Sequence, residues 1–222
     1  MTALQIHANP ADFVRQNTLV TTAPLLPEVR LHLATEVTPL WEATEETLRK
    51  TNLPPPYWAF AWPGGRAVAR FVLDQPELVR GRSVLDFAAG TGCVGIAAAL
   101  AGAAAVRACD IDAFSLAAIR LNAEANGVAL EVEGEDLVGL PLPGVDVVLA
   151  GDVCYERPMA ERVTAWLRTL AAAGTTVVLG DPGRAYVPKE GLEFLARYAV
   201  PTSLDLEDRE VRDTTVWRLL PD

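Results

Sequence analysis

Residues 84–95 read VLDFAAGTGCVG, an apolar run that ends in a glycine-rich turn. Gly90, Gly92 and Gly95 have the spacing G-x-G-x-x-G, which is typical of a strand–turn–helix unit that binds an adenosine-containing cofactor. Asp110 ends the next predicted strand, 20 residues after Gly90, where an acidic side chain can hydrogen-bond ribose hydroxyls. The stretch therefore predicts a nucleoside cofactor site, although a tight turn without a ligand would have the same glycines.

Asp86 helps to distinguish between classes of cofactor. In dinucleotide enzymes the pyrophosphate lies over the glycine turn and the helix N-terminus, where backbone N–H groups attract an anion. A carboxylate about 6 Å from a unit charge, at an effective dielectric constant of 20, changes its energy by roughly 2–3 kcal/mol. That change is unfavourable for a phosphate and favourable for an ammonium group. Asp86 therefore favours S-adenosylmethionine over NAD, unless it only caps backbone N–H groups at the strand end.

Strands and helices alternate from residue 82 onward, which predicts a doubly wound, mostly parallel α/β sheet with ligands at the carboxyl ends of its strands. We expect strands at 83–87, 105–110, 130–136, 145–152 and 175–182, and helices at 93–102, 113–127, 157–174 and 190–200. Residues 203–220 contain two extended segments around a charged turn, which predicts a C-terminal antiparallel hairpin.

The first 57 residues differ from the rest and are predicted to form an N-terminal extension, followed by the main domain at 58–222. A short helix is expected at 10–18 and a strand is possible at 29–35. Three consecutive prolines at 54–56 force extended backbone and mark the junction. A helix is expected after the sequence WPGG at 62–65, with Val68, Phe71, Val72 and Leu78 buried.

Composition limits the possible partners and metals. The chain has 222 residues and a net charge of −10 at pH 7, which argues against a general affinity for nucleic-acid phosphates and suits a basic partner. Three widely separated cysteines and two histidines predict neither a zinc site nor a disulfide framework. The sequence has no signal-peptide pattern and no apolar run long enough to span a membrane, so we expect a cytoplasmic protein, most simply a monomer.

Four segments resemble the motifs of class I (seven-stranded) S-adenosylmethionine-dependent methyltransferases. They are VLDFAAGTG at 84–92, ACDID at 108–112, GEDL at 134–137 and VDVVLAGDVCYE at 145–156. The resemblance implies a seven-stranded Rossmann-like sheet whose last strand is antiparallel, and an adenine-binding role for Asp136, which could otherwise simply end its strand. Within and beside these motifs it implies a cofactor-binding set of Trp62, Asp86, Ala88, Gly90, Gly92, Asp110, Ile111, Asp136, Leu137 and Gly151.

A narrower resemblance concerns the methyl acceptor. Asp152 and Tyr155 form an Asp-x-x-Tyr motif, and the segments at 55–73 and 180–188 are similar to the lysine methyltransferases that act on the electron transfer flavoprotein β-subunit. This resemblance implies a protein lysine as acceptor and that β-subunit as the favoured partner. Sequences described as nicotinamide-N-methyltransferase-like also look similar, so a small-molecule N-methyltransferase is the first alternative. An NAD-binding oxidoreductase and a binding-only relative are the others.

The chemistry of Asp152 and Tyr155 also points to an amine. Methyltransferases acting on planar nitrogens typically carry two prolines before the tyrosine, and this chain lacks both. A carboxylate and a phenol at the strand end can orient an amine after it loses its proton, and aromatic rings stabilise cationic character. We therefore predict that both residues are catalytic. Alternatively, Asp152 caps backbone groups and Tyr155 packs under the next helix.

Other residues near the predicted site have two interpretations each. Trp62 resembles the position that packs against the methionine end of the cofactor, but Trp58, Phe60 and Trp62 could equally form a hydrophobic lid. Asp181 and Arg184 could bind substrate or build a turn. Cys93 and Cys154 are expected to pack rather than react. Acids of the extension, which could hold a basic protein surface, are Glu36, Glu42, Glu45 and Glu46.

Overall fold

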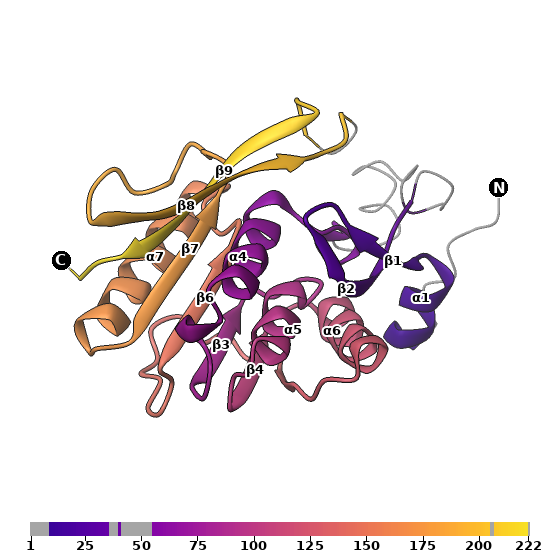
Figure 1. Cartoon of the computed structure of the whole chain (residues 1–222), viewed down its shortest axis with the longest axis horizontal. Coiled ribbons are helices and arrows are strands. Elements are labelled where there is room, and N and C mark those ends of the chain that lie inside the picture. Colours follow the sequence, from indigo (N-terminus) through magenta and orange to yellow (C-terminus); the bar gives the residue numbers. More distant parts are fainter. Residues whose placement is uncertain (1–8, 36–39, 41–54, 205–206, 222) are drawn as a thin grey trace.

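A computed structural model of the chain describes residues 9–35, 40, 55–204 and 207–221. Its elements, in chain order, are α1 (Pro10–Gln16), β1 (Leu19–Ala23), β2 (Leu26–Leu33), η1 (Tyr57–Ala59), α4 (Pro63–Asp74), η2 (Pro76–Leu78), β3 (Ser83–Phe87), α5 (Cys93–Leu100), β4 (Ala105–Cys109), α6 (Ala113–Asn126), β5 (Glu131–Glu133), β6 (Val147–Gly151), α7 (Arg157–Ala172), β7 (Thr176–Asp181), β8 (Leu192–Pro201) and β9 (Val211–Leu219). Figure 1 shows their arrangement.

Seven strands form one sheet in the order β5-β4-β3-β6-β7-β9-β8. The first five are parallel, whereas β9 runs antiparallel to both β7 and β8. The chain leaves β3 toward one edge of the sheet and returns through β6 toward the other, so the topological switch point lies between these two strands. This confirms the doubly wound, mostly parallel Rossmann-like sheet with a C-terminal antiparallel hairpin.

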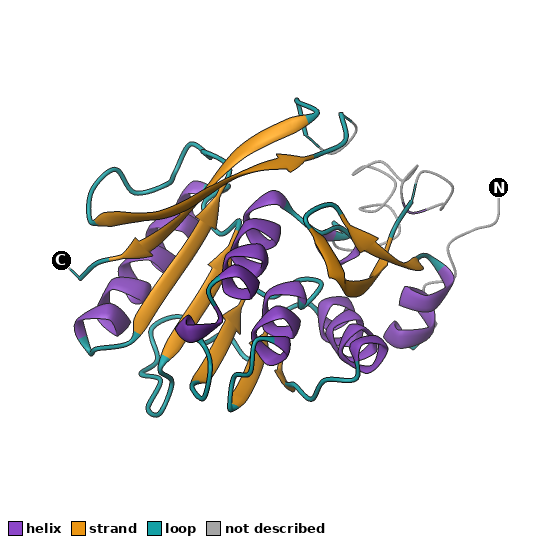
Figure 2. Cartoon of the chain, viewed as in Figure 1, coloured by secondary structure: helices purple, strands orange, loops and turns teal. Residues whose placement is uncertain are grey.

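The central strands are buried on both faces because helices cover both sides of the sheet. In β3, Val84 belongs to the core that includes α4 and α5, and its neighbour Leu85 belongs to the core that includes α7. Successive side chains of a strand point to opposite faces, so this alternation is the one that a two-sided sheet requires. Figure 2 shows α4, α5 and α6 on the near side of the sheet and α7 behind it.

The predicted helix at 190–200 is wrong, because these residues form strand β8. Leu192 and Phe194 pair with Leu219 and Trp217, and an irregularity between Phe194 and Ala196 shifts the register of the residues that follow. The Phe194 ring packs edge-on against the Trp217 ring of β9 at a centroid distance of 5.9 Å. Pairing with β9 thus overrides the helix propensity of the glutamate, leucine and alanine residues. The hairpin is therefore β8–β9, and its first arm begins earlier than expected.

The N-terminal part of the chain packs against α6. Helix α1 and strand β2 lie at the positions where a helix and a strand were expected, and β1 pairs with β2 as an additional strand. The backbone N–H of His32 donates a hydrogen bond to the Asn122 side chain over 2.7 Å, and Arg30 exchanges two hydrogen bonds with Asn126. The boundary at residue 57 stays a prediction, and Glu36, Glu42, Glu45 and Glu46 lie outside the described residues.

Candidate active site

The candidate site lies along the edge of the sheet where the parallel strands end. Because β5, β4, β3, β6 and β7 are neighbours in that order, their following loops lie side by side along one edge. Asp136, Asp110 and the glycine turn follow the first three strands. Asp152 and Tyr155 follow β6, Asp181 is the last residue of β7, and Arg184 follows it. The topology therefore divides the edge into a half expected to bind the cofactor and a half expected to bind the acceptor.

The glycine turn has the left-handed backbone that its composition predicts, with one exception in residue type. Gly90 has a φ of 52° and Gly92 a φ of 75°, and Ala88 has a φ of 54° although it is not glycine. Gly92 is the N-cap of α5, and a Cβ atom placed on it would lie 3.2 Å from the Ile119 side chain. The turn is thus held against α6 and leads directly into the N-terminus of α5.

Asp86 lies beneath this turn and not at its surface. It is 1% exposed, and its Oδ2 atom accepts a hydrogen bond from the backbone N–H of Gly95 over 2.7 Å. Burial raises the pKa of Asp86 to about 8, the Gly95 bond lowers this pKa, and the carboxylate of Asp110 raises it. The expectation that Asp86 faces a ligand directly is therefore not supported, because its carboxyl group caps a backbone N–H of α5, which was the alternative interpretation.

Asp110 fixes the turn from the neighbouring strand. Its Oδ2 atom accepts a hydrogen bond from the N–H of Gly90 over 2.8 Å, and its Oδ1 atom accepts one from the N–H of Asp112 over 3.0 Å. The next residue, Ile111, is 77% exposed, so its side chain is accessible to a ligand bound at the turn. Asp110 thus holds the glycine turn through its carboxylate, while its contact with ribose hydroxyls stays a prediction, and Ile111 offers an apolar side chain beside it.

Asp136 and Leu137 follow β5 and differ in exposure. The Asp136 carboxylate forms an ion pair with Arg162 of α7 at 2.7 Å and accepts a hydrogen bond from the N–H of Val138. Leu137 is 3% exposed and belongs to the core beneath α7. A ligand contact from Leu137 would therefore have to come from its backbone, whereas the half-exposed Asp136 side chain lies at the surface.

Asp152 is held at the N-terminus of α4. Its Oδ2 atom accepts a hydrogen bond from the backbone N–H of Gly65 over 2.8 Å, and its own backbone has a φ of 56°. A non-glycine residue with this backbone is uncommon, and such strain concentrates at functional sites. The Oδ1 atom is buried and accepts no hydrogen bond from the described residues. Burial raises the pKa of Asp152 to about 7, so this carboxyl group can change its protonation near neutral pH.

Gly151 allows α4 to pack closely against the end of β6. A Cβ atom on Gly151 would lie 2.4 Å from the backbone nitrogen of Gly65, and one on Gly180 of β7 would lie 2.4 Å from the carbonyl oxygen of Gly64. Two strand ends thus contact the backbone of α4 without side chains between them. Gly151 therefore has a packing role that its predicted place in the cofactor site did not include.

Aromatic rings form a row that starts at Tyr155, which follows β6 as Asp152 does. The Tyr155 ring lies 5.7 Å from the Tyr57 ring, which lies 5.9 Å from the Trp62 ring, and Trp62 lies 6.0 Å from Phe60. The indole N–H of Trp62 donates a hydrogen bond to the carbonyl oxygen of Tyr57 over 3.0 Å. Trp58 does not join them, because it is 1% exposed and packs against Phe13 and Phe114.

Tyr57 is the site residue that sequence reasoning missed. It is 46% exposed, as Tyr155 is 44% exposed, and its carbonyl oxygen lies 4.0 Å from the position of a Cβ atom on Gly90. It therefore connects the glycine turn to the acceptor half of the edge. The signal was available, because Tyr57 directly follows the proline run and precedes Trp58, but the pattern does not say which neighbouring ring is buried.

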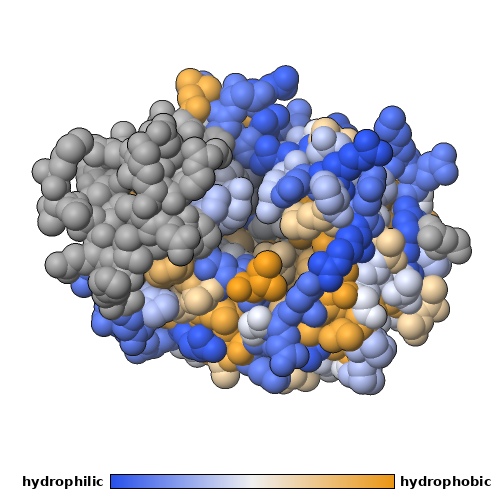
Figure 3. Space-filling view, turned by 180° about the vertical axis from the view of Figure 1, so that it is seen from behind, coloured by the Kyte–Doolittle hydropathy of each residue, from blue (hydrophilic) through white to orange (hydrophobic). Residues whose placement is uncertain are grey.

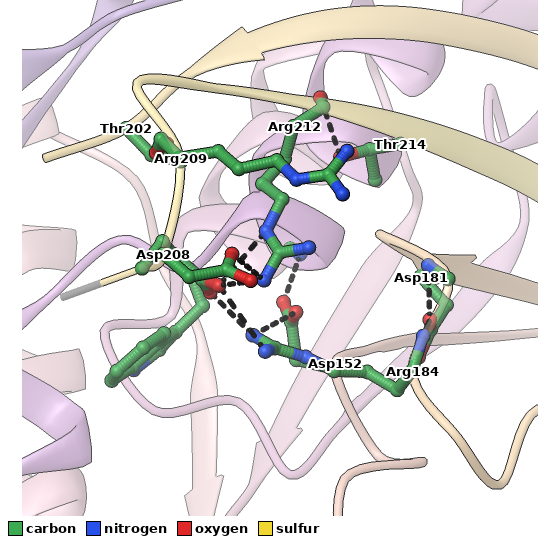
Figure 4. A network of polar contacts seen from close by, with 12 residues as sticks. Asp152, Asp181, Arg184, Thr202, Asp208, Arg209, Arg212 and Thr214 are labelled. Atoms are coloured by element: carbon green, nitrogen blue, oxygen red, sulfur yellow. Dashed lines mark hydrogen bonds and ion pairs between the residues drawn. The ribbon is translucent and has the colours of Figure 1, made fainter. Parts of the chain in front are cut away.

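Asp181 and Arg184 build the turn after β7. The Oδ1 atom of Asp181 accepts hydrogen bonds from the N–H groups of Gly183 and Arg184 over 2.7 and 2.6 Å. The Arg184 side chain then extends toward Asp152 and toward the β8–β9 connection, as Figure 4 shows. Burial raises the pKa of Asp181 to about 6. Asp181 therefore builds the turn, which was one of its two interpretations. Arg184 also contacts Glu207 and lies 4.0 Å from the Asp152 carboxyl group.

The cysteines have packing roles. Cys93, Cys109 and Cys154 are buried and reduced, and burial raises the pKa of each thiol to about 12. Thiols with such pKa values are poor nucleophiles at neutral pH. The described residues contain no group of three or more side chains able to hold a metal ion. None of the described helices is long and apolar enough to cross a membrane.

The surface of the molecule is hollowed in places. Seen from behind, it has a hollow near its middle with hydrophobic side chains along the lower border (Figure 3). Two other surface cavities lie away from the carboxyl edge. One of about 590 Å³ lies between the end of α4 and β8, near Asp74 and Tyr198. One of about 520 Å³ lies between α1 and α6, near Arg15 and Leu121. Neither cavity is lined by Asp86, Asp152 or Asp181, the carboxyl groups whose pKa values are raised toward neutrality. The candidate active site is therefore the carboxyl edge of the sheet and neither of these cavities.

The chain is similar in sequence to proteins of one curated group. It is 39% identical over 218 residues to the electron transfer flavoprotein beta subunit lysine methyltransferase of Xenopus laevis, covering 96% of this chain and 87% of that protein. It is 33% identical over 216 residues to the human protein of the same name, covering 94% and 81%. A family model described as ribosomal protein L11 methyltransferase matches residues 70–178.

Solved structures agree on the fold. The magnesium protoporphyrin IX methyltransferase of Synechocystis PCC 6803, crystallised with S-adenosylmethionine, superposes with a TM-score of 0.52 at 22% identity over 71% of this chain and 78% of that chain. Trm5b of Pyrococcus abyssi superposes with a TM-score of 0.55 at 14% identity over 92% and 56%. By its sequence similarity over nearly its whole length, the chain belongs to the electron transfer flavoprotein β-subunit lysine methyltransferase family.

Proposed function

We propose that this protein transfers a methyl group from S-adenosylmethionine to a lysine side chain of an electron transfer flavoprotein β-subunit. The observation that carries the proposal is the sequence similarity to the lysine methyltransferases of that subunit over 96% of the chain. The geometry supports it, because the Asp152 carboxyl group and the exposed Tyr155 ring both follow β6, and the Tyr155 ring lies 5.7 Å from the exposed Tyr57 ring.

The cofactor half of the edge fits S-adenosylmethionine better than a dinucleotide. Asp110 bonds to the turn, and Ile111 presents an exposed apolar surface next to it. The influences on the pKa of Asp86 are burial, the Gly95 N–H and Asp110, and no described cation is among them. Asp86 is buried beneath the turn, so the Asp110 carboxylate is the negative charge that a pyrophosphate would meet there. No described ion pair compensates that charge, whereas a cationic ligand suits this environment. When bound, the cofactor supplies an electrophilic methyl group on a sulfonium.

The acceptor half of the edge can prepare an amine for this transfer. A lysine ammonium group has no lone pair, so it must release a proton to solvent or to a carboxylate before the N–CH₃ bond can form. The carboxylate of ionised Asp152, whose side chain is 12% exposed, can accept a hydrogen bond from the amine and so direct its lone pair. The rings of Tyr57, Trp62 and Tyr155 stabilise the cationic charge that appears on the nitrogen as the bond forms. Most of the acceleration would come from this alignment.

Methyl transfer from labelled S-adenosylmethionine to purified electron transfer flavoprotein β-subunit tests the proposal. We expect mass spectrometry of the product to locate one to three added methyl groups on a lysine. Asp152→Asn should reduce transfer by a factor of about 100 or more and leave cofactor binding largely intact. Asp146→Asn is the matched control, since Asp146 lies before β6 and bonds to the N–H of Ser83, away from the site.

Assays with other acceptors and ligands distinguish the alternative functions. Label on arginine or glutamine, or no incorporation, would contradict the lysine assignment. Transfer to nicotinamide but not to protein would establish the small-molecule alternative. Calorimetry with S-adenosylhomocysteine and with NAD would show tight binding of NAD alone if the protein were an oxidoreductase. Binding of S-adenosylhomocysteine without turnover on any acceptor would indicate a binding-only relative.

Three further expectations stay proposals. The protein works as a monomer, which light scattering after size-exclusion chromatography would check. It resides in the cytoplasm, which fractionation of cells would check. Residues 1–57 help to hold the protein substrate, which a truncated variant beginning after the proline run would check by a raised KM for the protein acceptor and an unchanged KM for the cofactor.

A further inference from the structure

Arg184 lies between the carboxylates of Glu207 and Asp152 and is closer to Glu207. Its guanidinium group forms a double contact with Glu207 of the β8–β9 connection, one through Nη2 to Oε1 and one of 3.2 Å through Nη1 to Oε2. The same Nη2 atom lies 4.0 Å from Oδ1 of Asp152. Glu207 therefore has the hydrogen-bonded contact and Asp152 the longer, purely electrostatic one.

Glu207 is itself shared between two arginines. Arg212 of β9 approaches its Oε2 atom with Nη2 at 2.9 Å and with Nε at 3.1 Å. The Glu207 side chain is only 3% exposed, and those of Arg184 and Arg212 are 24% and 19% exposed, so solvent screens these charges only weakly. Figure 4 shows Arg184 and Arg212 extending toward the same region from different elements. Glu207 thus remains paired if its contact with Arg184 is lost.

The two oxygens of Asp152 are in different situations. Oδ2 is held by the N–H of Gly65, whereas Oδ1 is buried, faces the Arg184 side and accepts no hydrogen bond from the described part of the chain. Besides Arg184, the charged or titratable groups that act on Asp152 come from α4, α5, β7, the loop after β6 and the β8–β9 connection. They are Arg66, Cys93, Cys154, Asp181 and Glu207.

We propose that Arg184 is a positioning residue that keeps the carboxyl group of Asp152 ionised for the acceptor amine, and that Glu207 limits this effect by holding the same guanidinium group. The inference rests on the proposed function, because it assumes that Asp152 meets the acceptor. In this arrangement Glu207 of the β8–β9 connection, far along the chain from Asp152, influences the charge of the Asp152 carboxyl group. Arg184 itself need not touch the substrate.

The proposal predicts opposite effects for two substitutions. Arg184→Gln removes the positive charge nearest to Oδ1, so the pKa of Asp152 should rise by about one unit. Glu207→Gln removes a nearby negative charge and releases Arg184 toward Asp152, so the same pKa should fall, by about half a unit or more. A residue that only stabilises the turn would give no such pair of opposite shifts.

A direct titration tests this without any methyl acceptor. The protein is labelled with carbon-13 at the aspartate side-chain carboxyl carbons, and the Asp152 signal is assigned by its loss in Asp152→Asn. Its midpoint is then measured in the wild type, Arg184→Gln and Glu207→Gln. Arg218→Gln is the matched control, since Arg218 pairs with Glu193 at 3.1 Å at the far end of the hairpin, and it should leave the midpoint unchanged.

The outcomes separate this inference from the proposed function. Opposite shifts in the two variants support the inference, and equal or absent shifts overturn it, whether or not the wild type methylates any protein. Where the wild type is active, the acidic limb of the kcat profile should shift with the measured midpoints. If Arg184→Gln does not fold, Arg184→Lys replaces it. The lysine ammonium group cannot form the two contacts that the guanidinium group of Arg184 forms with Glu207. A titration midpoint identical to that of the wild type would therefore contradict the proposed role of the guanidinium group.

Discussion

The backbone of Gly65 lies directly on Gly151, so closely that a Cβ atom on Gly151 would be 2.4 Å from the Gly65 nitrogen and 2.5 Å from its Cα atom. This approach places the N–H of Gly65 within 2.8 Å of the Asp152 carboxylate. The first turn of α4 therefore presents an N–H donor and the positive end of the helix dipole to the predicted catalytic carboxyl group. Packing between two glycines is thus a condition for the geometry of the site.

Gly151→Ala is expected to disturb both packing and activity. The added methyl group must push α4 away from β6, and overpacking of this kind costs about 1 to 3 kcal/mol of unfolding free energy. Because the shift also lengthens the Gly65–Asp152 hydrogen bond, methyl transfer should fall more than the loss of folded protein explains. Chemical denaturation and kcat measured on the same samples check this.

Gly65→Ala is the matched control for that substitution. A Cβ atom on Gly65 would meet the Cys93 sulfur at 3.6 Å, an ordinary van der Waals contact, and alanine keeps the N–H that Asp152 accepts. Alanine is also the better helix former, so stability should stay level or rise by up to about 1 kcal/mol. Equal destabilisation by the two variants would contradict the proposed packing.

The sheet could be predicted well because its strands carry strong local signals. Strand β3 and the glycine turn after it combine an apolar run, a glycine spacing and an acid in the next strand, so the sequence specifies them redundantly. Strand β8 has no such redundancy. Its residues favour a helix locally, and only the Phe194–Trp217 contact and pairing with β9 make it a strand. That information lies in another segment of the chain.

The site was predictable at the level of motifs but not of side-chain orientation. Asp110 and Asp152 lie at strand ends as their spacing implied, since the topology brings those ends together. The pattern could not say that Asp86 lies beneath the turn, because a strand-end acid can point to either side. In the same way, Tyr57 and Trp58 are adjacent in sequence, and only packing against Phe114 decides that Trp58 is the buried one.

Ala88→Gly is expected to stabilise the protein. Ala88 has a φ of 54° and an exposed side chain, so its Cβ atom is in a strained left-handed conformation and contributes little packing. Glycine removes a strain of about 1 to 2 kcal/mol but loses about 0.4 to 1 kcal/mol through a more flexible unfolded chain. The net gain in unfolding free energy should lie between about 0 and 1.6 kcal/mol by urea denaturation. Ala88→Val should instead destabilise, and the reverse order would contradict the assignment of strain.

Asp86→Asn should flatten the pH dependence of stability. Burial raises the pKa of Asp86 from 3.8 to about 8, so the folded state binds a proton that the unfolded state has released between these values. Stability is therefore lost as the pH rises through this window. The asparagine variant cannot lose that proton, so relative to wild type its unfolding free energy should improve by about 2 to 4 kcal/mol from pH 5 to pH 9. Parallel curves for the two proteins would show that Asp86 does not titrate there.

An Asp→Asn change at the surface provides the comparison for this measurement. Asp12 is exposed and pairs with Arg15 within α1 at 3.2 Å, so Asp12→Asn should change stability little at any pH. In Asp86→Asn the new side-chain amide can still accept the Gly95 N–H through its oxygen, which keeps the cap of α5. A variant that unfolds at every pH would indicate instead that the carboxyl form itself is required for folding.

Tyr57→Leu should weaken methyl transfer although Tyr57 was not among the predicted site residues. The substitution removes the ring between Tyr155 and Trp62 but keeps the carbonyl that accepts the Trp62 indole N–H. Loss of a cation–π partner of roughly 0.5–2 kcal/mol corresponds to a decrease of about 2- to 30-fold in kcat/KM for the lysine acceptor. Tyr57→Phe keeps the ring and should stay within about twofold of wild type. If the phenylalanine and leucine variants lose activity equally, the ring face is not what the acceptor uses. The phenol oxygen would then be the group to follow by titration of the reaction against pH.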